Sequence, residues 1–265
     1  MSAPIPFEPR RFRAAAAHYL TGRPAYAADL FARVALHCGL GRDDAVLDLG
    51  CGPGQLALGF APLVGAVTAI DPEPEMLQIA AAQAAVAGAD IRVVAGSSYD
   101  IGPELGSFKL AAIGRAFHWM DRPDTLARLD RMITRDGAVA LFSDRHPAVH
   151  ENRWRKVYDT LLDRYSAGDA ARAQRKSPDW QPHESVLLAS PFRRLERISV
   201  LERRRTPLQH IVDRMLSLSS VSHAQIGDRA DRLAGDLQSG LADFAADGIV
   251  DEVVESEALI ARRPG

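Results

Sequence analysis

The sequence predicts an α/β fold built on a doubly wound, parallel sheet. In the first 145 residues, short apolar runs typical of buried strands alternate with segments of helical periodicity. The first of these runs leads into a glycine-rich turn and then into a helix. Apolar residues make up 47% of the chain and charged residues 25%, a balance typical of a globular domain. Strands and helices that alternate in this way favour a parallel sheet with helices on both faces.

The first 145 residues supply the parallel part of this sheet. Residues 10–38 are expected to be helical with a break, because Gly22 and Pro24 interrupt the apolar spacing. The apolar runs predict five strands, at residues 45–49, 66–70, 91–94, 109–113 and 138–142. Helices are predicted at residues 55–63, from Pro74, and from Pro123 with Leu126, Leu129, Met132 and Ile133 on its inner face. A turn at Asp136-Gly137 is expected to lead into the fifth strand.

After residue 147 the regular alternation ends. Residues 148–190 are predicted to be an insertion, partly helical and partly loop, that forms a lid or substrate cap. The core domain is then expected to comprise residues 1–147 and 191–265. Its second part is predicted to contain a strand at 192–202, helices at 207–219 and 226–244, and a closing strand at 249–261.

Charge and cysteine content exclude several functional classes. The chain of 265 residues has 32 basic and 34 acidic residues, so it lacks the positive excess that a nucleic-acid partner requires. Cys38 and Cys51 form neither a disulfide framework nor a metal-binding spacing, which favours a cytoplasmic protein without a metal. The first nine residues hold no apolar run, and no stretch of eighteen apolar residues exists, so neither a signal peptide nor a membrane span is expected.

The glycine-rich turn follows directly after the first predicted strand. Glycines at 50, 52 and 54 allow a ligand to approach the backbone closely, and the following helix presents free N–H groups to an anion. A dinucleotide fingerprint would need glycine where this sequence has Gln55.

Two carboxylates indicate which ligand the turn accepts. Asp48 lies just before the turn, where it would repel a pyrophosphate but attract an ammonium group. Asp71 ends the second predicted strand, a position from which a carboxylate accepts hydrogen bonds from ribose hydroxyls. The pair therefore suits a nucleoside joined to an amino acid, which is the chemistry of S-adenosylmethionine.

Further motifs narrow this interpretation. They are Tyr19-Leu20-Thr21-Gly22-Arg23-Pro24, Asp48-Leu49-Gly50-Cys51-Gly52-Pro53-Gly54, Ile70-Asp71-Pro72 with Met76-Leu77, Gly96-Ser97-Ser98, and Ala116-Phe117-His118-Trp119. In their order and spacing the sequence resembles the class I S-adenosylmethionine-dependent methyltransferases. Within that class it is similar to the small-molecule branch near the trans-aconitate and ubiquinone-type enzymes. This resemblance implies a Rossmann-like sheet of seven strands and S-adenosyl-L-homocysteine as a product.

The resemblance also implies which residues bind the cofactor. Tyr19 and Arg23 would hold its carboxylate, and Asp48 with Gly50 and Gly52 would receive its methionine part and ammonium group. Asp71 would bind the ribose hydroxyls. The remaining cofactor contacts are assigned to Pro72, Met76, Ser97, Ser98 and Arg115. Many relatives have an acidic residue in place of Ser97, so that contact to the adenine differs here. For Tyr19, Arg23 and Met76 the alternative is a purely structural role.

Residues that follow the fourth and fifth predicted strands are candidates for the acceptor site. The carboxyl ends of parallel strands line the ligand crevice of such a sheet, which places Phe117, His118 and Trp119 beside the transferred methyl group. His118 is the candidate general base, because its unperturbed pKa lies near physiological pH. Phe117, Trp119 and His146 are expected to contact the substrate. The alternative for His118 and Trp119 is that they only order the pocket wall or the core.

These observations predict the S-adenosylmethionine-dependent N- or O-methylation of a small molecule, for example in natural-product biosynthesis. A monomer or homodimer is expected, with no nucleic-acid or membrane partner. The alternatives are an NAD-dependent oxidoreductase, an RNA methyltransferase and a non-catalytic protein that binds S-adenosylmethionine.

Overall fold

The computed structural model describes residues 16–265, so the first part of the helical segment predicted at residues 10–38, residues 10–15, lies outside the described residues. A single sheet with the order β3-β2-β1-β4-β5-β8-β6 forms its centre, and a short strand, β7, pairs with β8. The strands are β1 (Ala45–Leu49), β2 (Ala66–Asp71), β3 (Ile91–Ala95), β4 (Phe108–Gly114), β5 (Ile133–Arg145), β6 (Arg194–Pro207), β7 (Ala245–Ala246) and β8 (Ile249–Arg262). The strands β1 to β5 are parallel, and β8 is antiparallel to both β5 and β6. The predicted doubly wound sheet is therefore confirmed.

Helices cover both faces of the sheet, because successive residues of each strand point to opposite faces. On one face, Val46 of β1 packs with α2 (Ala28–Cys38) and α3 (Gln55–Phe60). On the other face, Leu47 packs with α5 (Arg122–Asp130) and α8 (His183–Leu188). A longer helix, α4 (Pro74–Ala87), contacts β2 and β3.

A third hydrophobic core lies outside the sheet. We call α6 (Arg155–Tyr165), α9 (Leu208–Leu216) and α11 (Arg229–Leu241) the helical cluster; their apolar faces bury Trp154, Leu162, Met215 and Leu233 against one another. The first described helix, α1 (Ala16–Gly22), packs on α9. Smaller elements complete the chain: η1 (Pro103–Leu105), η2 (Phe117–Trp119), η3 (His150–Asn152), α7 (Ala170–Lys176), α10 (His223–Ile226) and η4 (Ala242–Phe244).

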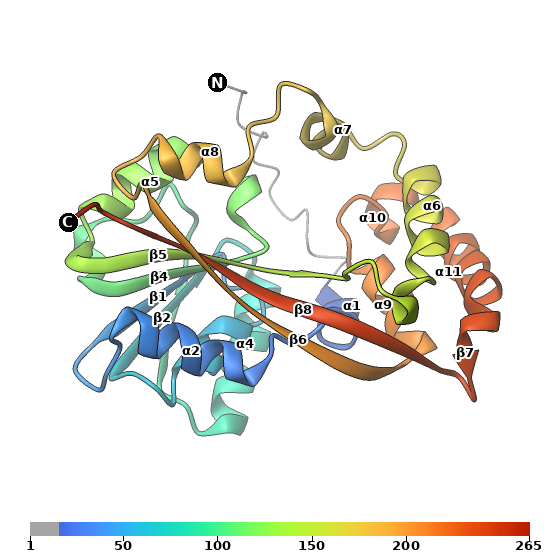
Figure 1. The fold of residues 1–265 in the computed structure, drawn as a ribbon, viewed down its shortest axis with the longest axis horizontal. Coiled ribbons are helices and arrows are strands. Elements are labelled where there is room, and N and C mark those ends of the chain that lie inside the picture. Colours follow the sequence, from blue (N-terminus) through green and yellow to red (C-terminus); the bar gives the residue numbers. More distant parts are fainter. Residues whose placement is uncertain (1–15) are drawn as a thin grey trace.

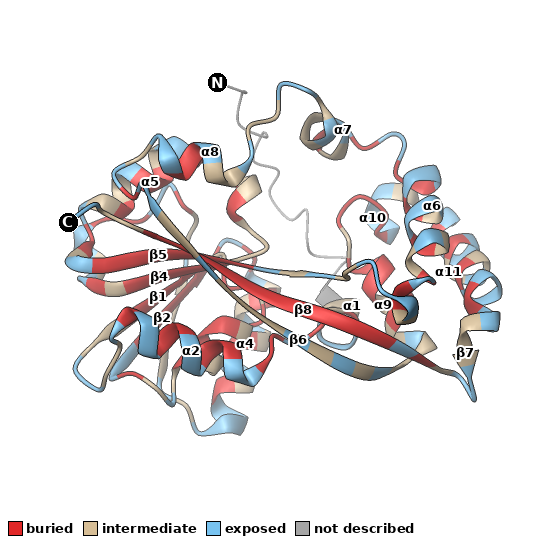
Figure 2. Cartoon of the chain, in the orientation of Figure 1, coloured by how far each residue is buried: buried red, intermediate tan, exposed pale blue. Residues whose placement is uncertain are grey.

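Two long strands connect the sheet with the helical cluster. The strands β6 and β8 pair without interruption from Arg194–Arg262 to Pro207–Ile249. They run from the sheet to the helices at the right of Figure 1. Figure 2 shows that β8 is buried along most of its length, whereas β6 is intermediate or exposed. The buried strand thus belongs to both parts of the molecule.

Several predicted boundaries are wrong in detail. The helix from Pro123 ends at Asp130, and Ile133 already belongs to β5, where it pairs with Phe108. Because a register shift after this pair lets β5 continue, Asp136-Gly137 lies inside the strand rather than in a turn before it.

Helix α3 ends at Phe60 rather than at residue 63. The predicted helix at 226–244 is divided, because Gly227 takes a left-handed φ of 56° between α10 and α11. The described residues include no helix that is long and apolar enough to cross a bilayer.

The predicted division at residues 148 and 190 stays a prediction. The helical cluster combines α6, from within the predicted insertion, with α9 and α11 from outside it.

Candidate active site

The glycine-rich turn connects β1 with α3. Gly50, Gly52 and Gly54 all have left-handed φ angles, 70°, 52° and 84° respectively. A Cβ atom on Gly50 would lie 2.8 Å from the Cβ of Ala116, whereas a Cβ on Gly52 would have no atom within 4 Å. Gly50 therefore permits close packing against the segment after β4, and Gly52 leaves open space above the turn.

Asp48 is a buried carboxyl group with an incomplete set of hydrogen bonds. Its Oδ2 accepts a hydrogen bond of 2.8 Å from the backbone N–H of Ala57 in α3. Its Oδ1 is buried and has no hydrogen-bond partner among residues 16–265. Burial raises the pKa of Asp48 to about 7. An ammonium group beside Oδ1 would satisfy this oxygen and favour its charged form.

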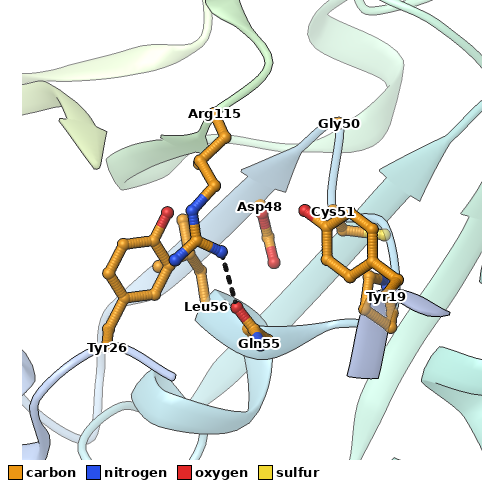
Figure 3. Close-up of a pocket in the computed structure, with 10 residues that line it drawn as sticks. Tyr19, Tyr26, Asp48, Gly50, Cys51, Gln55, Leu56 and Arg115 are labelled. Carbon is orange, nitrogen blue, oxygen red and sulfur yellow. Dashed lines mark hydrogen bonds between the residues drawn. The ribbon is translucent and has the colours of Figure 1, made fainter. Parts of the chain in front are cut away.

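A small cavity of about 10 Å³ lies beside Asp48. Figure 3 shows Tyr19 from α1 on one side of Asp48, and Tyr26 with Arg115 on the other. This volume is close to that of one water molecule, so an amino-acid group enters only when a surrounding side chain moves. The residues that line this cavity are Tyr19, Tyr26, Asp48, Gly50, Cys51, Pro53, Gln55, Leu56, Gly114 and Arg115.

Arg115 is held by protein groups on all sides. Its guanidinium forms an ion pair with Asp144 and donates hydrogen bonds to Gln55 Oε1 at 3.0 Å and to the Pro24 carbonyl at 2.7 Å. It also lies 4.3 Å from the centre of the Tyr26 ring. Arg115 therefore joins α3, β5 and the segment after α1 around the small cavity, a role beyond the cofactor contact expected from the sequence.

Sequence reasoning missed Tyr26, Gln55 and Asp144. A signal for Asp144 was present, because this carboxylate lies at the carboxyl end of β5 as Asp71 does in β2. Arg115 lowers the pKa of Asp144 against the opposing effect of burial. No comparable pattern in the sequence indicates Tyr26 or Gln55.

Asp71 links the end of β2 to the glycine-rich turn. Its Oδ2 accepts from the N–H of Gly52 at 2.8 Å, and its Oδ1 accepts from the N–H of Glu73 at 2.9 Å. Burial raises the pKa of this carboxyl group, and the two backbone hydrogen bonds oppose that effect. Each oxygen keeps a further lone pair, so the arrangement can still accept hydrogen bonds from a diol.

Four further residues assigned to the cofactor line neither cavity described here. Pro72 is exposed and Met76 is buried in α4. Ser97 donates from Oγ to Asp100 at 2.7 Å, and Ser98 is buried. These four assignments stay predictions.

Arg23 follows α1 and faces a larger cavity of about 380 Å³. Its Nε is buried without a hydrogen-bond partner in the described part of the chain. Such a donor suits the cofactor carboxylate that the sequence analysis assigns to Tyr19 and Arg23. The Arg23 guanidinium lies 5.3 Å from the centre of the Tyr19 ring.

The larger cavity lies at the carboxyl ends of β4 and β5. It brings together His118 and Phe117 from η2 with His183 from α8. Its lining comprises Arg23, Ile113, Arg115, Ala116, Phe117, His118, Leu141, Phe142, Ser143, Asp144, His183, Glu184, Arg197, Glu257 and Leu259. Burial lowers the pKa of His118 well below 6.5, and Arg175 and His183 act in the same direction. The His118 imidazole is therefore neutral near pH 7, as a general base must be, but it is a weaker base than a free imidazole.

The structure does not bring Trp119 and His146 to the lining of this cavity. The Trp119 ring lies 4.8 Å from the His118 ring and below the guanidinium of Arg175. The side chain of His146 is only 5% exposed, and its Nε2 lies 2.7 Å from Glu252 Oε2. Because β5 continues to Arg145, it carries His146 beyond the cavity and toward the helical cluster. The described residues include no group of three or more side chains arranged for a metal.

Comparison with known proteins agrees with this geometry. A model of the methyltransferase domain family matches residues 46–137, which include the glycine-rich turn, Asp71 and His118. The chain has no match among curated proteins.

Three solved structures share the fold. A SAM-dependent methyltransferase from Geobacter sulfurreducens, in complex with S-adenosyl-L-homocysteine, is 15% identical with a TM-score of 0.55, and the match covers 100% of both chains. A second from Thiobacillus denitrificans, with the same ligand, is 14% identical with a TM-score of 0.54 over 99% of this chain and 100% of that one. YjhP from E. coli is 14% identical with a TM-score of 0.56 over 97% of this chain and 100% of its own. Residues 46–137 therefore match the methyltransferase domain family, and the chain has the fold of the class I S-adenosylmethionine-dependent methyltransferases.

Proposed function

We propose that this protein transfers a methyl group from S-adenosylmethionine to the nitrogen or oxygen of a small molecule held in the larger cavity. The observation that carries the proposal is the half-satisfied carboxyl group of Asp48, together with the open space above Gly52 in the turn that follows it. S-adenosylmethionine supplies a methyl group on a positively charged sulfur, which needs alignment with a nucleophile and exclusion of water rather than a strong acid.

The protein's own residues would divide the work between the two cavities. Asp48 and the turn receive the ammonium group, Arg23 and Tyr19 the carboxylate, and Asp71 the ribose hydroxyls. In the larger cavity, His118 accepts the proton that the acceptor loses as its bond to the methyl carbon forms and the carbon–sulfur bond breaks. The electron pair of that broken bond stays on sulfur.

The larger cavity also supports the proposal of a small acceptor. Its volume of about 380 Å³ lies in the range of small-molecule sites. Its lining combines apolar residues of β4 and β5 with charged residues. His183 and Glu184 come from residues 148–190, which we propose cap the acceptor. A role in natural-product biosynthesis is part of this proposal.

The acidic side chains Asp159 and Asp163, in residues 148–190, do not line the larger cavity. Asp159 pairs with Arg155, and Asp163 pairs with Arg172 and Lys176. These carboxylates are therefore satisfied away from the cavity, and recognition of an amine would fall to the acids of the cavity lining.

Calorimetry with S-adenosyl-L-homocysteine tests the cofactor site. We expect binding in the micromolar range and none for NAD. Asp71→Ala should weaken binding by about 10- to 100-fold, because it removes a charged acceptor and releases the Gly52 N–H. Asp90→Ala is the matched control, since this exposed carboxylate precedes β3 (Ile91–Ala95) at the end away from the glycine-rich turn. Binding of NAD alone, or equal binding by Asp71→Ala, would contradict the assignment.

Substitution of His118 tests the proposed base. His118→Asn should lower kcat by about 100-fold or more while leaving the Kd for S-adenosyl-L-homocysteine unchanged. Because the lowered pKa keeps the imidazole neutral, wild-type kcat should stay level as pH falls from 8 to 6.5 and decline only further down. Release of S-adenosyl-L-homocysteine is measured with an acceptor found by screening amines and phenols. Full kcat in His118→Asn would remove the base assignment.

A further inference from the structure

Helix α1 rests directly on the backbone of α9. A Cβ atom added to Gly22, at the end of α1, would lie 2.3 Å from the backbone nitrogen of Arg214 and 2.4 Å from the carbonyl carbon of Asp213. No side chain fits at this contact, so glycine allows the two helices to approach this closely. The helix that carries Tyr19 is therefore positioned by the helical cluster.

Three polar contacts fix the same pair of segments. Arg214 Nε donates to the carbonyl of Gly22 at 3.2 Å, and Arg23 donates to the carbonyl of Ser217 at 3.3 Å. His18 Nδ1 lies 3.0 Å from Asp213 Oδ1. The contact from Arg214 satisfies a carbonyl at the end of α1 that no helical N–H can reach.

Arg214 itself is held rigidly. Its guanidinium is buried and donates two hydrogen bonds to Glu252 of β8, at 2.8 and 2.9 Å. Glu252 also accepts from Thr206 of β6 and contacts His146. Burial of Glu252 opposes its ionisation, but Arg214 and His146 hold the pKa of this carboxyl group well below its usual range. A buried pair with this geometry keeps Arg214 in one orientation.

We propose that Arg214 is a positioning residue that holds α1 and the Arg23 that follows it, and so keeps Tyr19 at the cofactor cavity beside Asp48 and Arg23 at the larger cavity. This inference rests on the proposed function, because it assigns the bound ligand to the cavity beside Asp48. Since that cavity has only about 10 Å³ of space, the cofactor enters and leaves when α1 separates from α9. Loosening the contact between α1 and α9 should speed dissociation of the cofactor more than it slows methyl transfer.

The test compares glycine substitutions in two helices. Gly22→Ala forces α1 away from α9 and should raise the dissociation rate and Kd of S-adenosyl-L-homocysteine by about tenfold or more. Gly235→Ala in α11 is the matched control, because its Cβ would meet no atom within 4 Å. This control should bind like the wild type. Binding is measured by calorimetry and dissociation by stopped-flow competition.

Arg214→Lys provides a second variant if Gly22→Ala does not fold. Lysine keeps the charge near Glu252 but loses the paired hydrogen bonds and the Nε donor to Gly22. We expect the same faster dissociation, together with faster hydrogen exchange in residues 18–23 and unchanged exchange in β1 and β4.

The outcomes separate the inference from the proposed function. If the wild-type protein does not bind S-adenosyl-L-homocysteine, the proposed function fails. If it binds and Arg214→Lys or a folded Gly22→Ala binds equally well, the positioning role of Arg214 is wrong. An equal loss in Gly235→Ala would likewise overturn it.

Discussion

Replacing Asp48 with asparagine should raise the free energy of unfolding, relative to that of the wild type, more at pH 8 than at pH 4.5. The pKa of Asp48 rises from 3.8 to about 7 on folding, so the folded state holds this proton more tightly than the unfolded state does. The wild type therefore loses stability as pH rises from about 4 through 7, and asparagine does not. The full loss corresponds to roughly 4 kcal/mol.

Chemical denaturation of both proteins at the two pH values measures this effect. Any cost of the asparagine amide itself is the same at both pH values, so the change with pH isolates the ionisation of Asp48. A difference in the free energy of unfolding that does not depend on pH would contradict the buried, raised pKa.

The same substitution should weaken cofactor binding. Asp48→Asn removes the charge that we assign to the cofactor's ammonium group, and an ionic hydrogen bond of this kind corresponds to about 10- to 100-fold in affinity. Asp44→Asn is the matched control, because Asp44 precedes β1 at the end away from the glycine-rich turn. Asp48→Asn would then combine higher stability with weaker binding, as expected for a strained functional carboxylate. Unchanged affinity for S-adenosyl-L-homocysteine would place the ammonium group elsewhere.

Alanine at Gly50 should mainly lower stability, whereas alanine at Gly52 should mainly weaken cofactor binding. Gly50→Ala combines a left-handed backbone with a Cβ 2.8 Å from Ala116 and 3.3 Å from Met120, so we expect a loss of about 2–4 kcal/mol in stability. Gly52→Ala has the left-handed backbone alone and should cost about 1 kcal/mol. Its added methyl group nevertheless occupies the space assigned to the cofactor, so affinity for S-adenosyl-L-homocysteine should fall strongly.

Gly88→Ala controls for backbone strain. Gly88 has a φ of 61° at the end of α4, and its Cβ would also meet no atom within 4 Å. It should match Gly52→Ala in stability and match the wild type in binding. Thermal unfolding and calorimetry measure both properties. Equal affinities for Gly52→Ala and Gly88→Ala would show that the cofactor does not pack on this turn.

Local patterns in the sequence were sufficient to predict the parallel half of the sheet. Each strand from β1 to β5 contains a short apolar run, which identifies the strand without knowledge of its neighbours. Only β5 extends well beyond its run, from Ile133 to Arg145. Asp48 and Asp71 follow from the same logic, because their places at strand ends fix where their carboxylates lie.

Features that depend on contacts between distant residues were not predictable in this way. Gly22 and Arg214 are 192 residues apart, and no pattern around either one indicates their contact. His146 was expected in the crevice because it follows the strand predicted at residues 138–142. The strand β5 continues for three more residues, to Arg145, and so carries His146 past the site. Arg115 has the expected place and an additional role, because its partners come from three separate segments.

The position of β8 has a consequence for the order in which the chain acquires its structure during synthesis. Residues 249–262 lie between β5 and β6 in the sheet, so neither of these strands has its antiparallel neighbour until this late segment has left the ribosome. The parallel strands β1 to β5 can assemble earlier, with helices on both faces. Glu252, the anchor of Arg214, arrives only with β8. The nascent chain thus completes the parallel part of its sheet first and gains a fixed α1 last, in a step that joins segments far apart in sequence and is slow for that reason.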